Sequence, residues 1–322
     1  MDVRDNMAVE VSGLFKKFGD NIAVDAVSFT IQTGSICAML GPNGAGKTTV
    51  INMLATLLKP DSGVAKIFGY DIAKDSHIVR QLIGLTGQFA TVDEGLSALD
   101  NLTIYGQLVG FSNKVSKKKA MELLEEFDLI EAAKREVSKF SGGMRRRLDL
   151  AASLISRPPL IFLDEPTTGL DPRTRIQMWD TIRTLVNTGA TVLMTTQYLE
   201  EADKLADRII VIDQGRVVGN DSPGMLKKAV GSLSLHIIVQ DLEKAVFAAG
   251  IVEKLIGNEA QVSDGGKVTV SLRSTDRLSE ILEALKNAEI AIEEINVVKP
   301  TLDEVFFALT GMSKTEEDAQ HG

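Results

Sequence analysis

Gly41-Pro42-Asn43-Gly44-Ala45-Gly46-Lys47-Thr48 decides the fold, because this stretch fits the pattern G-x-x-x-x-G-K-[ST] in full. It follows an apolar run over 36–40, typical of a strand buried on both faces, and precedes a helical pattern over 47–58. The glycines let successive backbone N–H groups turn inward around anionic oxygens, and the following helix adds the positive end of its dipole. The sequence therefore predicts a phosphate-binding loop between a strand and a helix of an α/β domain.

Two side chains of this loop carry the chemistry of a nucleoside triphosphate site. Lys47 is expected to reach the β- and γ-phosphates, and the Thr48 hydroxyl to ligate Mg²⁺. The alternative is a glycine-rich turn without a ligand, which the flanking strand and helix disfavour. The predicted nucleotide-binding residues here are Gly41, Pro42, Asn43, Gly44, Ala45, Gly46, Lys47, Thr48 and Thr49.

A second apolar run, over 160–163, ends in Asp164 and Glu165. Acids at the carboxyl end of a buried parallel strand point into the crevice where such sheets bind ligands. Asp164 is then placed to hold Mg²⁺ through water, and Glu165 to polarise a water that attacks the γ-phosphate. The alternative is a strand-end acid that caps the next helix.

Composition excludes several classes of protein. The 322 residues include 35 Lys+Arg and 44 Asp+Glu, a net charge of −9, which disfavours nucleic acid as the partner. The single cysteine, Cys37, excludes an intrachain disulfide and is interpreted as a small hydrophobe in a buried strand. No apolar run approaches the roughly 18 residues that span a bilayer, so we expect a soluble intracellular chain.

The chain length favours two domains. Residues 1–222 alternate strand and helix patterns and predict an α/β nucleotide-binding domain with a largely parallel sheet and a helical subdomain at about 95–155. Loop formers at 220–224 indicate a boundary, with a linker over 223–231. Residues 232–312 predict a small α+β accessory or regulatory domain, with a small-molecule sensor as the alternative, and 313–322 a disordered polar tail.

A third motif, Phe140-Ser141-Gly142-Gly143-Met144, makes the chain resemble the ATPase subunits of ABC transporters from residue 9 to about 221. The resemblance implies an ABC-type P-loop fold in which Gln88 senses the Mg²⁺–nucleotide site and Phe18 stacks on adenine. Ser141, Gly142 and Gly143 would bind the ATP held by a partner subunit, since Gly-Gly after serine opens another anion-binding helix. Two chains would then sandwich two nucleotides in a homodimer.

Two positions depart from the pattern of that family. Met144 stands where the family usually has glutamine, and methionine cannot hydrogen-bond a ribose as an amide can. Gln197 stands where most members place a histidine that contacts the γ-phosphate. Glutamine keeps a donor but cannot become positively charged. We therefore expect slow but real hydrolysis, with Glu165, Gln197 and Lys47 as catalytic residues.

The segments 141–150, 195–203 and 300–306 resemble the ATP-binding subunit of the daunorubicin/doxorubicin-resistance exporters. This resemblance implies a peripheral subunit on the cytoplasmic face of the cell membrane, which uses ATP and Mg²⁺ to drive a separate polytopic permease of the ABC-2 type that exports hydrophobic compounds. The alternatives are a soluble ABC-type ATPase and a low-turnover nucleotide-dependent regulator.

Two further features have competing interpretations. The cluster 145–147 of three arginines could contact phosphates, acids near the nucleotide or the permease, whereas the simpler hypothesis is a solvated helix face with structural ion pairs. Trp179, at helical spacing with Ile176 and Ile182, is expected in the core.

Overall fold

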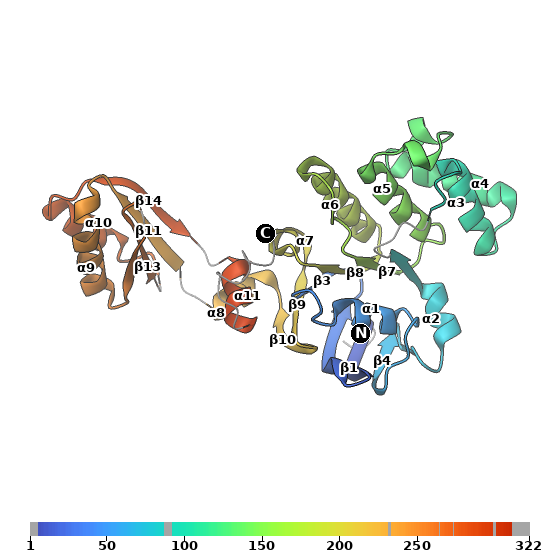
Figure 1. The fold of residues 1–322 in the computed structure, drawn as a ribbon, viewed down its shortest axis with the longest axis horizontal. Helices are drawn as coiled ribbons and strands as arrows, with labels where there is room; N and C mark the ends of the chain where they lie inside the picture. The colour runs from blue at the N-terminus through green and yellow to red at the C-terminus, as the bar shows by residue number, and fades with distance from the viewer. Residues whose placement is uncertain are drawn as a thin grey trace. The chain divides into compact units, whose positions relative to one another are not determined.

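A computed structural model describes residues 6–86, 92–230, 233–263, 265–272, 274–298 and 301–310. The chain divides into two compact units, Met1–Pro223 and Gly224–Gly322, each with its own sheet or sheets (Figure 1). Gln88 and the tail 313–322, for which the sequence makes predictions, lie outside the described residues.

A six-stranded sheet forms the centre of the first unit. Its strands follow the order β10-β9-β3-β8-β7-β6, and all neighbours are parallel except β10 and β9. The continuous apolar runs of the sequence form its middle strands, and every residue of β3, β7 and β8 is buried. The strands are β3 (Ile36–Leu40), β6 (Ile83–Thr86), β7 (Leu160–Asp164), β8 (Thr191–Thr196), β9 (Arg208–Asp213) and β10 (Arg216–Asp221).

The first unit also contains an antiparallel sheet that the expectation of a largely parallel sheet missed. Its order is β2-β1-β4-β5, from β1 (Met7–Phe18), β2 (Asn21–Gln32), β4 (Ser62–Ile67) and β5 (Tyr70–Asp71). Register shifts interrupt the pairing of β1 with both neighbours, so the two-residue alternation that marks a half-buried strand is broken in the sequence. Both sheets contribute to one hydrophobic core with helix α1 (Lys47–Leu54).

Helices cover the parallel sheet and build a helical segment between β6 and β7 (Figure 1). In that segment the spacing of Leu123, Leu124, Phe127 and Ile130 predicts one apolar stripe. The first three are buried and Ile130 is partly buried. Short 3-10 turns lie at Ile130–Ala132 and Val137–Lys139. The helices are α2 (Ser76–Leu82), α3 (Ala98–Leu108), α4 (Asn113–Glu126), α5 (Gly142–Ser153), α6 (Pro172–Asn187) and α7 (Leu199–Leu205).

The second unit is the predicted α+β fold, in the order strand-helix-strand-strand-helix-strand that defines a ferredoxin-like arrangement. Its antiparallel sheet has the order β12-β13-β11-β14, and α9 and α10 pack on its core. The segment expected as a linker contains helix α8 (Pro223–Val230). The other elements are β11 (Leu233–Val239), a 3-10 turn (Leu242–Lys244), α9 (Ala245–Ile256), β12 (Ala260–Ser263), β13 (Lys267–Leu272), α10 (Leu278–Asn287), β14 (Ile292–Val298) and α11 (Leu302–Thr310).

Within the described part of the chain, no helix is both long enough and apolar enough to cross a membrane.

The reactivity of the Cys37 thiol measures whether the central sheet is folded. The side chain is 0% exposed in β3, and burial raises the pKa of its thiol to about 12. At pH 8 the thiolate fraction is then about 10⁻⁴, and the sulfur is inaccessible. We predict that a disulfide reagent labels less than about a tenth of the native chains and every chain in urea. Stoichiometric labelling without denaturant would contradict this burial.

Candidate nucleotide-binding site

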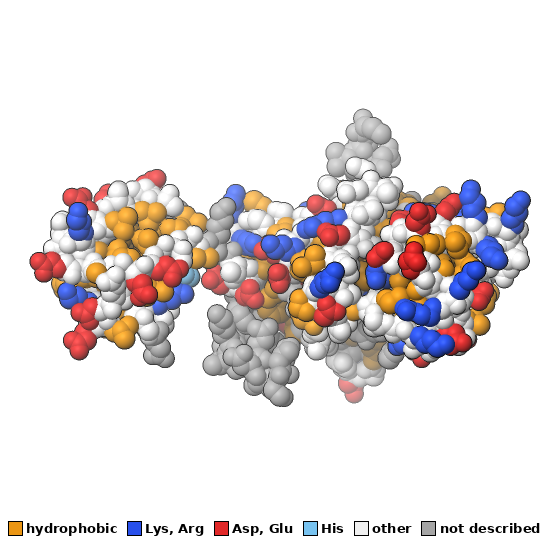
Figure 2. Space-filling model, turned by 90° about the horizontal axis from the view of Figure 1, so that it is seen from above, with side chains coloured by type: hydrophobic (Ala, Val, Ile, Leu, Met, Phe, Trp, Pro, Cys, Tyr) orange, Lys and Arg blue, Asp and Glu red, His pale blue; other side chains and the backbone are white. Residues whose placement is uncertain are grey.

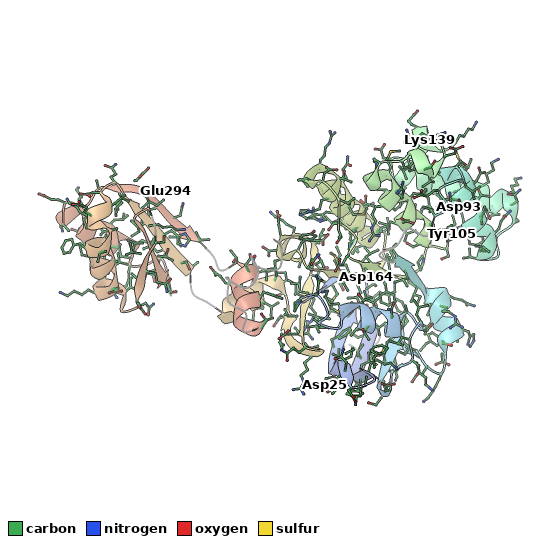
Figure 3. The ribbon with its side chains drawn as sticks, in the orientation of Figure 1. Asp25, Asp93, Tyr105, Lys139, Asp164 and Glu294 are labelled. Carbon is green, nitrogen blue, oxygen red and sulfur yellow. The ribbon has the colours of Figure 1, made fainter. Side chains whose placement is uncertain are left out.

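The carboxyl ends of three neighbouring parallel strands form the site. Strand β8 lies between β3 and β7, with Leu40 opposite Thr196 and Asp164 opposite Thr195. The phosphate loop after β3, Gln197 after β8 and Glu165 after β7 therefore start from one edge of the sheet, where Asp164 is labelled in Figure 3. This is the edge at which open parallel sheets bind ligands.

Close backbone approach requires two glycines of the loop. A Cβ on Gly41 would lie 2.2 Å from the carbonyl oxygen of Ile212, and one on Gly46 would lie 2.4 Å from that of Ala23. Gly46 also has a φ of 106°, which disfavours any L side chain. These contacts fix the loop at the amino end of α1 as the predicted anion nest requires.

The Lys47 ammonium is folded over this loop. It is 5% exposed and donates to the carbonyl oxygens of Gly41, at 2.7 Å, and Pro42, at 3.0 Å. Burial lowers the pKa of Lys47, and the carboxylates of Glu165 and Asp164 oppose that shift. A cation held among carbonyls can exchange these partners for phosphate oxygens.

Thr48, at the start of α1, and Asp164, at the end of β7, are within hydrogen-bond distance of one another. The Thr48 hydroxyl lies 3.2 Å from Oδ2 and 3.4 Å from Oδ1 of Asp164. Asp164 is 4% exposed, and the Thr195 hydroxyl also donates to it. Hydroxyl and carboxylate oxygens are the hard ligands that Mg²⁺ takes together with substrate phosphates, so the pair fits this ion. The described residues contain no group of three or more His, Cys, Asp or Glu side chains that could bind a metal by itself.

Glu165 adopts a left-handed backbone conformation, with a φ of 48°. Its N–H donates to the hydroxyl and the carbonyl oxygen of Thr195, at 3.0 and 3.2 Å. Its Oε2 accepts from the Thr168 hydroxyl at 3.1 Å. The carboxylate is partly exposed and so can reach a ligand at the edge.

Gln197 is partly exposed at the end of β8, in a short connection to α7. The residues on either side of Gln197 are linked to each other, because the Tyr198 N–H donates to the Thr196 hydroxyl at 3.0 Å. The guanidinium of Arg175 packs 4.6 Å from the centre of the Tyr198 ring. The backbone around Gln197 is therefore held by its neighbours.

The other predicted nucleotide residues, Ser141, Gly142, Gly143 and Phe18, come from the start of α5 and the end of β1. Ser141 caps α5, accepting from the Met144 N–H at 3.3 Å, and both Ser141 and Gly142 are exposed. A Cβ on Gly142 would meet nothing within 4 Å, whereas one on Gly143 would lie 2.4 Å from a methyl of Thr174. Phe18 is 48% exposed at the end of β1, with the Lys16 ammonium 5.5 Å from its ring centre.

Sequence reasoning missed Thr195 and Glu201. Glu201 is 0% exposed on α7 and accepts from the Nε1–H of Trp179 at 3.0 Å. Burial raises the pKa of Glu201. This shift is opposed by the hydroxyls of Thr196 and Thr167, by Trp179 and by the charge of Arg175. A glutamate in a helix gives no sequence signal of burial, because charged residues are ordinarily solvated.

Trp179 is buried with Ile182, as expected, but Ile176 is 54% exposed. The expectation that Ile176 belongs to the same core stripe is wrong. The helix places residue 176 nearly one turn before Trp179, close to the amino end of α6, where the core face has not yet begun.

We predict that Glu201 makes stability depend on pH. Because its pKa is raised in the folded state, its contribution is present below the unfolded pKa, about 4.3, and is lost as pH rises. Glu201→Gln still accepts from Trp179 but does not titrate. The free energy of unfolding of wild type minus that of Glu201→Gln should fall between pH 4.5 and 8. Urea unfolding followed by the fluorescence of the single tryptophan measures it.

The exposed neighbour Glu200 supplies the control, since Glu200→Gln makes the same substitution one position away at an exposed site of the same helix. If the difference in free energy of unfolding between wild type and Glu201→Gln stayed constant from pH 4.5 to 8, burial would not raise the pKa of the Glu201 carboxyl group.

Comparison with known proteins identifies the family. The family model described as "ABC transporter" matches residues 24–168, and that described as "ATP-binding protein DrrA1-3-like, C-terminal domain" matches residues 222–310. The daunorubicin/doxorubicin resistance ATP-binding protein DrrA of Streptomyces peucetius is 44% identical over 329 residues, covering 99% of this chain and 98% of that protein. The Nod factor export ATP-binding protein I of a Rhizobium species is 34% identical, covering 95% and 97%.

A solved structure shares the fold of the first unit. It is the dimeric post-hydrolysis state of the ATP-binding cassette MJ0796 bound to ADP and Pi, with 27% identity and a TM-score of 0.61 over 66% of this chain and 98% of that one. The chain therefore belongs to the ATP-binding proteins of ABC transporters, a family that hydrolyses ATP. The resemblance to the DrrA proteins, the predicted fold class and the ATPase activity are confirmed.

Proposed function

We propose that this chain is the ATP-hydrolysing subunit of an exporter and drives a separate polytopic permease of the ABC-2 type. The observation that carries the proposal is the convergence of Lys47, Asp164 and Glu165 at one sheet edge, with Gln197 between them in strand order. These strand ends bring together the Lys47 cation, the Thr48–Asp164 pair and the partly exposed carboxylate of Glu165, a set of groups that supports binding and hydrolysis of a phosphate anhydride.

Each residue has a distinct part in hydrolysis. The loop N–H groups and Lys47 bind the phosphates, while Thr48 and Asp164 would hold Mg²⁺, which supplies charge neutralisation at the phosphate oxygens. Glu165 accepts the proton of the attacking water, and Gln197 orients that water or the γ-phosphate by hydrogen bonds. Phe18 offers its exposed ring to the adenine.

The second half of each site would come from another copy. The start of α5, with Ser141 and Gly142 exposed, is an N-terminal helix end with open space beside it. Closure of two chains around two nucleotides would give a twofold dimer in which each copy supplies both surfaces. MJ0796, which shares this fold, has a dimeric structure. Binding of ATP would close the dimer and hydrolysis would reopen it.

The helical segment offers a surface for the permease. Its exposed large hydrophobic residues are Ile104, Leu108, Val109, Val115 and Met121. Figure 2 shows hydrophobic side chains gathered over this segment among Lys and Arg side chains. Such a patch suits a partner that carries the membrane spans this chain's described helices lack. One relative is named for daunorubicin/doxorubicin resistance and another for Nod factor export, and these names support export as the direction of transport. The proposal places the chain on the cytoplasmic face of the membrane, where it would drive export of hydrophobic compounds.

A second candidate function is a nucleotide-dependent regulator with negligible turnover. The observation that favours it is Gln197, because a glutamine cannot carry the positive charge that a histidine can place beside the γ-phosphate.

Glu165→Gln separates the two functions. We predict that it lowers kcat for ATP at least about 10²-fold, since it removes the general base, while ATP still binds. The variant should collect as ATP-bound dimers, measured by size-exclusion chromatography with light scattering. A wild type without turnover would support the regulator, and a monomeric ATP-loaded variant would contradict dimer closure.

Gln197→Ala tests the role of the glutamine. Loss of one hydrogen-bond donor to the reacting groups should lower kcat about 10-fold or more with KM little changed. Gln177→Ala, an exposed glutamine on α6, should leave both unchanged. Equal kcat for Gln197→Ala and wild type would remove Gln197 from the mechanism.

Co-purification with a polytopic membrane protein from the native host tests the transport assignment.

A further inference from the structure

Arg146 extends from α5 to the turn that carries the catalytic carboxylate. Its Nη2 donates to the carbonyl oxygens of Asp164, at 2.9 Å, and Glu165, at 3.0 Å, and its Nε to that of Pro166, at 3.1 Å. One planar guanidinium therefore holds three consecutive carbonyl groups. A rigid fork of donors is the geometry that arginine supplies and lysine does not.

The turn it holds is strained. Glu165 has a φ of 48° and precedes Pro166, although a residue before proline favours extended backbone. A left-handed conformation is unfavourable for a non-glycine residue and persists only where the surroundings fix it. Thr195 fixes the N–H of Glu165, and Arg146 fixes its carbonyl. These two contacts determine the direction in which the Glu165 side chain leaves the backbone.

The charge of Arg146 is balanced by acids from both sides. Burial lowers the pKa of its guanidinium, and the carboxylates of Asp149, Asp164 and Glu165 oppose that shift. Arginine stays charged at these positions. The contacts with the turn are therefore charge-assisted, which makes them stronger than ordinary hydrogen bonds between neutral groups.

Arg146 also lies on the helix that begins at Ser141. It is a little more than one turn from the cap of α5, so the two residues belong to one rigid element. Three hydrogen bonds from Arg146 therefore connect this helix to the carbonyls of the turn.

We propose that Arg146 is a positioning residue that fixes the catalytic carboxylate of Glu165 and couples it to the start of α5. The inference rests on the proposed function, because it takes Glu165 as the base and the start of α5 as the half-site for the nucleotide of the other copy. When α5 moves on closure, Arg146 moves the turn with it. Each copy would thus align its own base when its own Ser141 engages the other nucleotide.

The adjacent arginines provide matched controls. Arg147 donates to the carbonyl oxygen of Phe127 at 2.9 Å, within the helical segment, and Arg145 pairs with Glu94 at 3.2 Å. Neither has a recorded bond to the turn 164–166. Arg147→Met therefore removes an arginine–carbonyl bond from the same helix, and Arg145→Met removes a surface ion pair.

The experiment compares steady-state ATPase kinetics and thermal unfolding of full-length wild type, Arg146→Met, Arg146→Lys, Arg147→Met and Arg145→Met. For Arg146→Met we expect kcat to fall about 100-fold, the cost of a misplaced catalytic group, with KM within about threefold of wild type. Arg146→Lys should keep the fold and lose about 10-fold in kcat, since an ammonium cannot fork across three carbonyls. Arg147→Met should lower Tm but keep kcat within about threefold.

Chemical rescue of kcat adds a measurement that a loss of stability alone would not explain. Methylguanidinium at millimolar concentration should restore kcat of Arg146→Ala at least about 10-fold, whereas methylammonium should not. Wild-type kcat in Arg146→Lys, or an equal loss of kcat in Arg147→Met, would overturn the proposal. Should Arg146→Met not fold, Arg146→Lys carries the test. A wild type without ATPase activity would instead refute the proposed function, which distinguishes the two failures.

Discussion

The position of β8 between β3 and β7 is the constraint on which the site depends. The three parallel strands β3, β8 and β7 are buried throughout, and their carboxyl ends lie side by side. Residues from widely separated parts of the chain are therefore close together at these ends, even where the loops that carry them make no contact. Asp164 lies at the junction, because it accepts from Thr195 of the neighbouring strand and from Thr48 at the start of α1. Its burial makes these bonds necessary, since an unpaired buried carboxylate is costly. The sheet order thus sets the geometry of the site before any ligand enters.

Much of this site could be predicted from the sequence because its motifs are local. The phosphate loop needs a glycine pattern between a strand and a helix, and Asp164-Glu165 ends an apolar run, so neighbours in the chain suffice to recognise them. Thr195, Arg146 and Glu201 could not be predicted in the same way. Their partners are tens of residues away, and a threonine in an apolar strand or an arginine among arginines has no distinctive spacing. The antiparallel sheet was missed for a related reason, because shifts in register break the alternation on which its recognition depends.

The arginine cluster shows why composition alone does not separate structural from functional charge. Arg145 pairs on the surface, Arg147 ties α5 to the end of α4, and Arg146 reaches the catalytic turn. The interpretation of the cluster as structural ion pairs holds for two members, because Arg145 pairs with Glu94 and Arg147 with Asp128. The third member, Arg146, also has a structural role, but its partner is the backbone of Glu165, the proposed general base. Whether such a contact also affects the mechanism therefore depends on the function of the partner.

In the proposed mechanism, Gln197 makes the placement of Glu165 more important than a histidine at the same position would. A glutamine can hold the water or the γ-phosphate by hydrogen bonds but cannot share the proton or the charge. In the proposed mechanism the proton of the attacking water therefore passes to Glu165, because the amide of Gln197 cannot accept it. On this proposal, the rate depends on how closely the Glu165 carboxylate approaches the water, and the left-handed turn at Glu165 sets the direction of that carboxylate. The bonds from Thr195 and Arg146 that hold this turn are accordingly the part of the scaffold to which hydrolysis should be most sensitive.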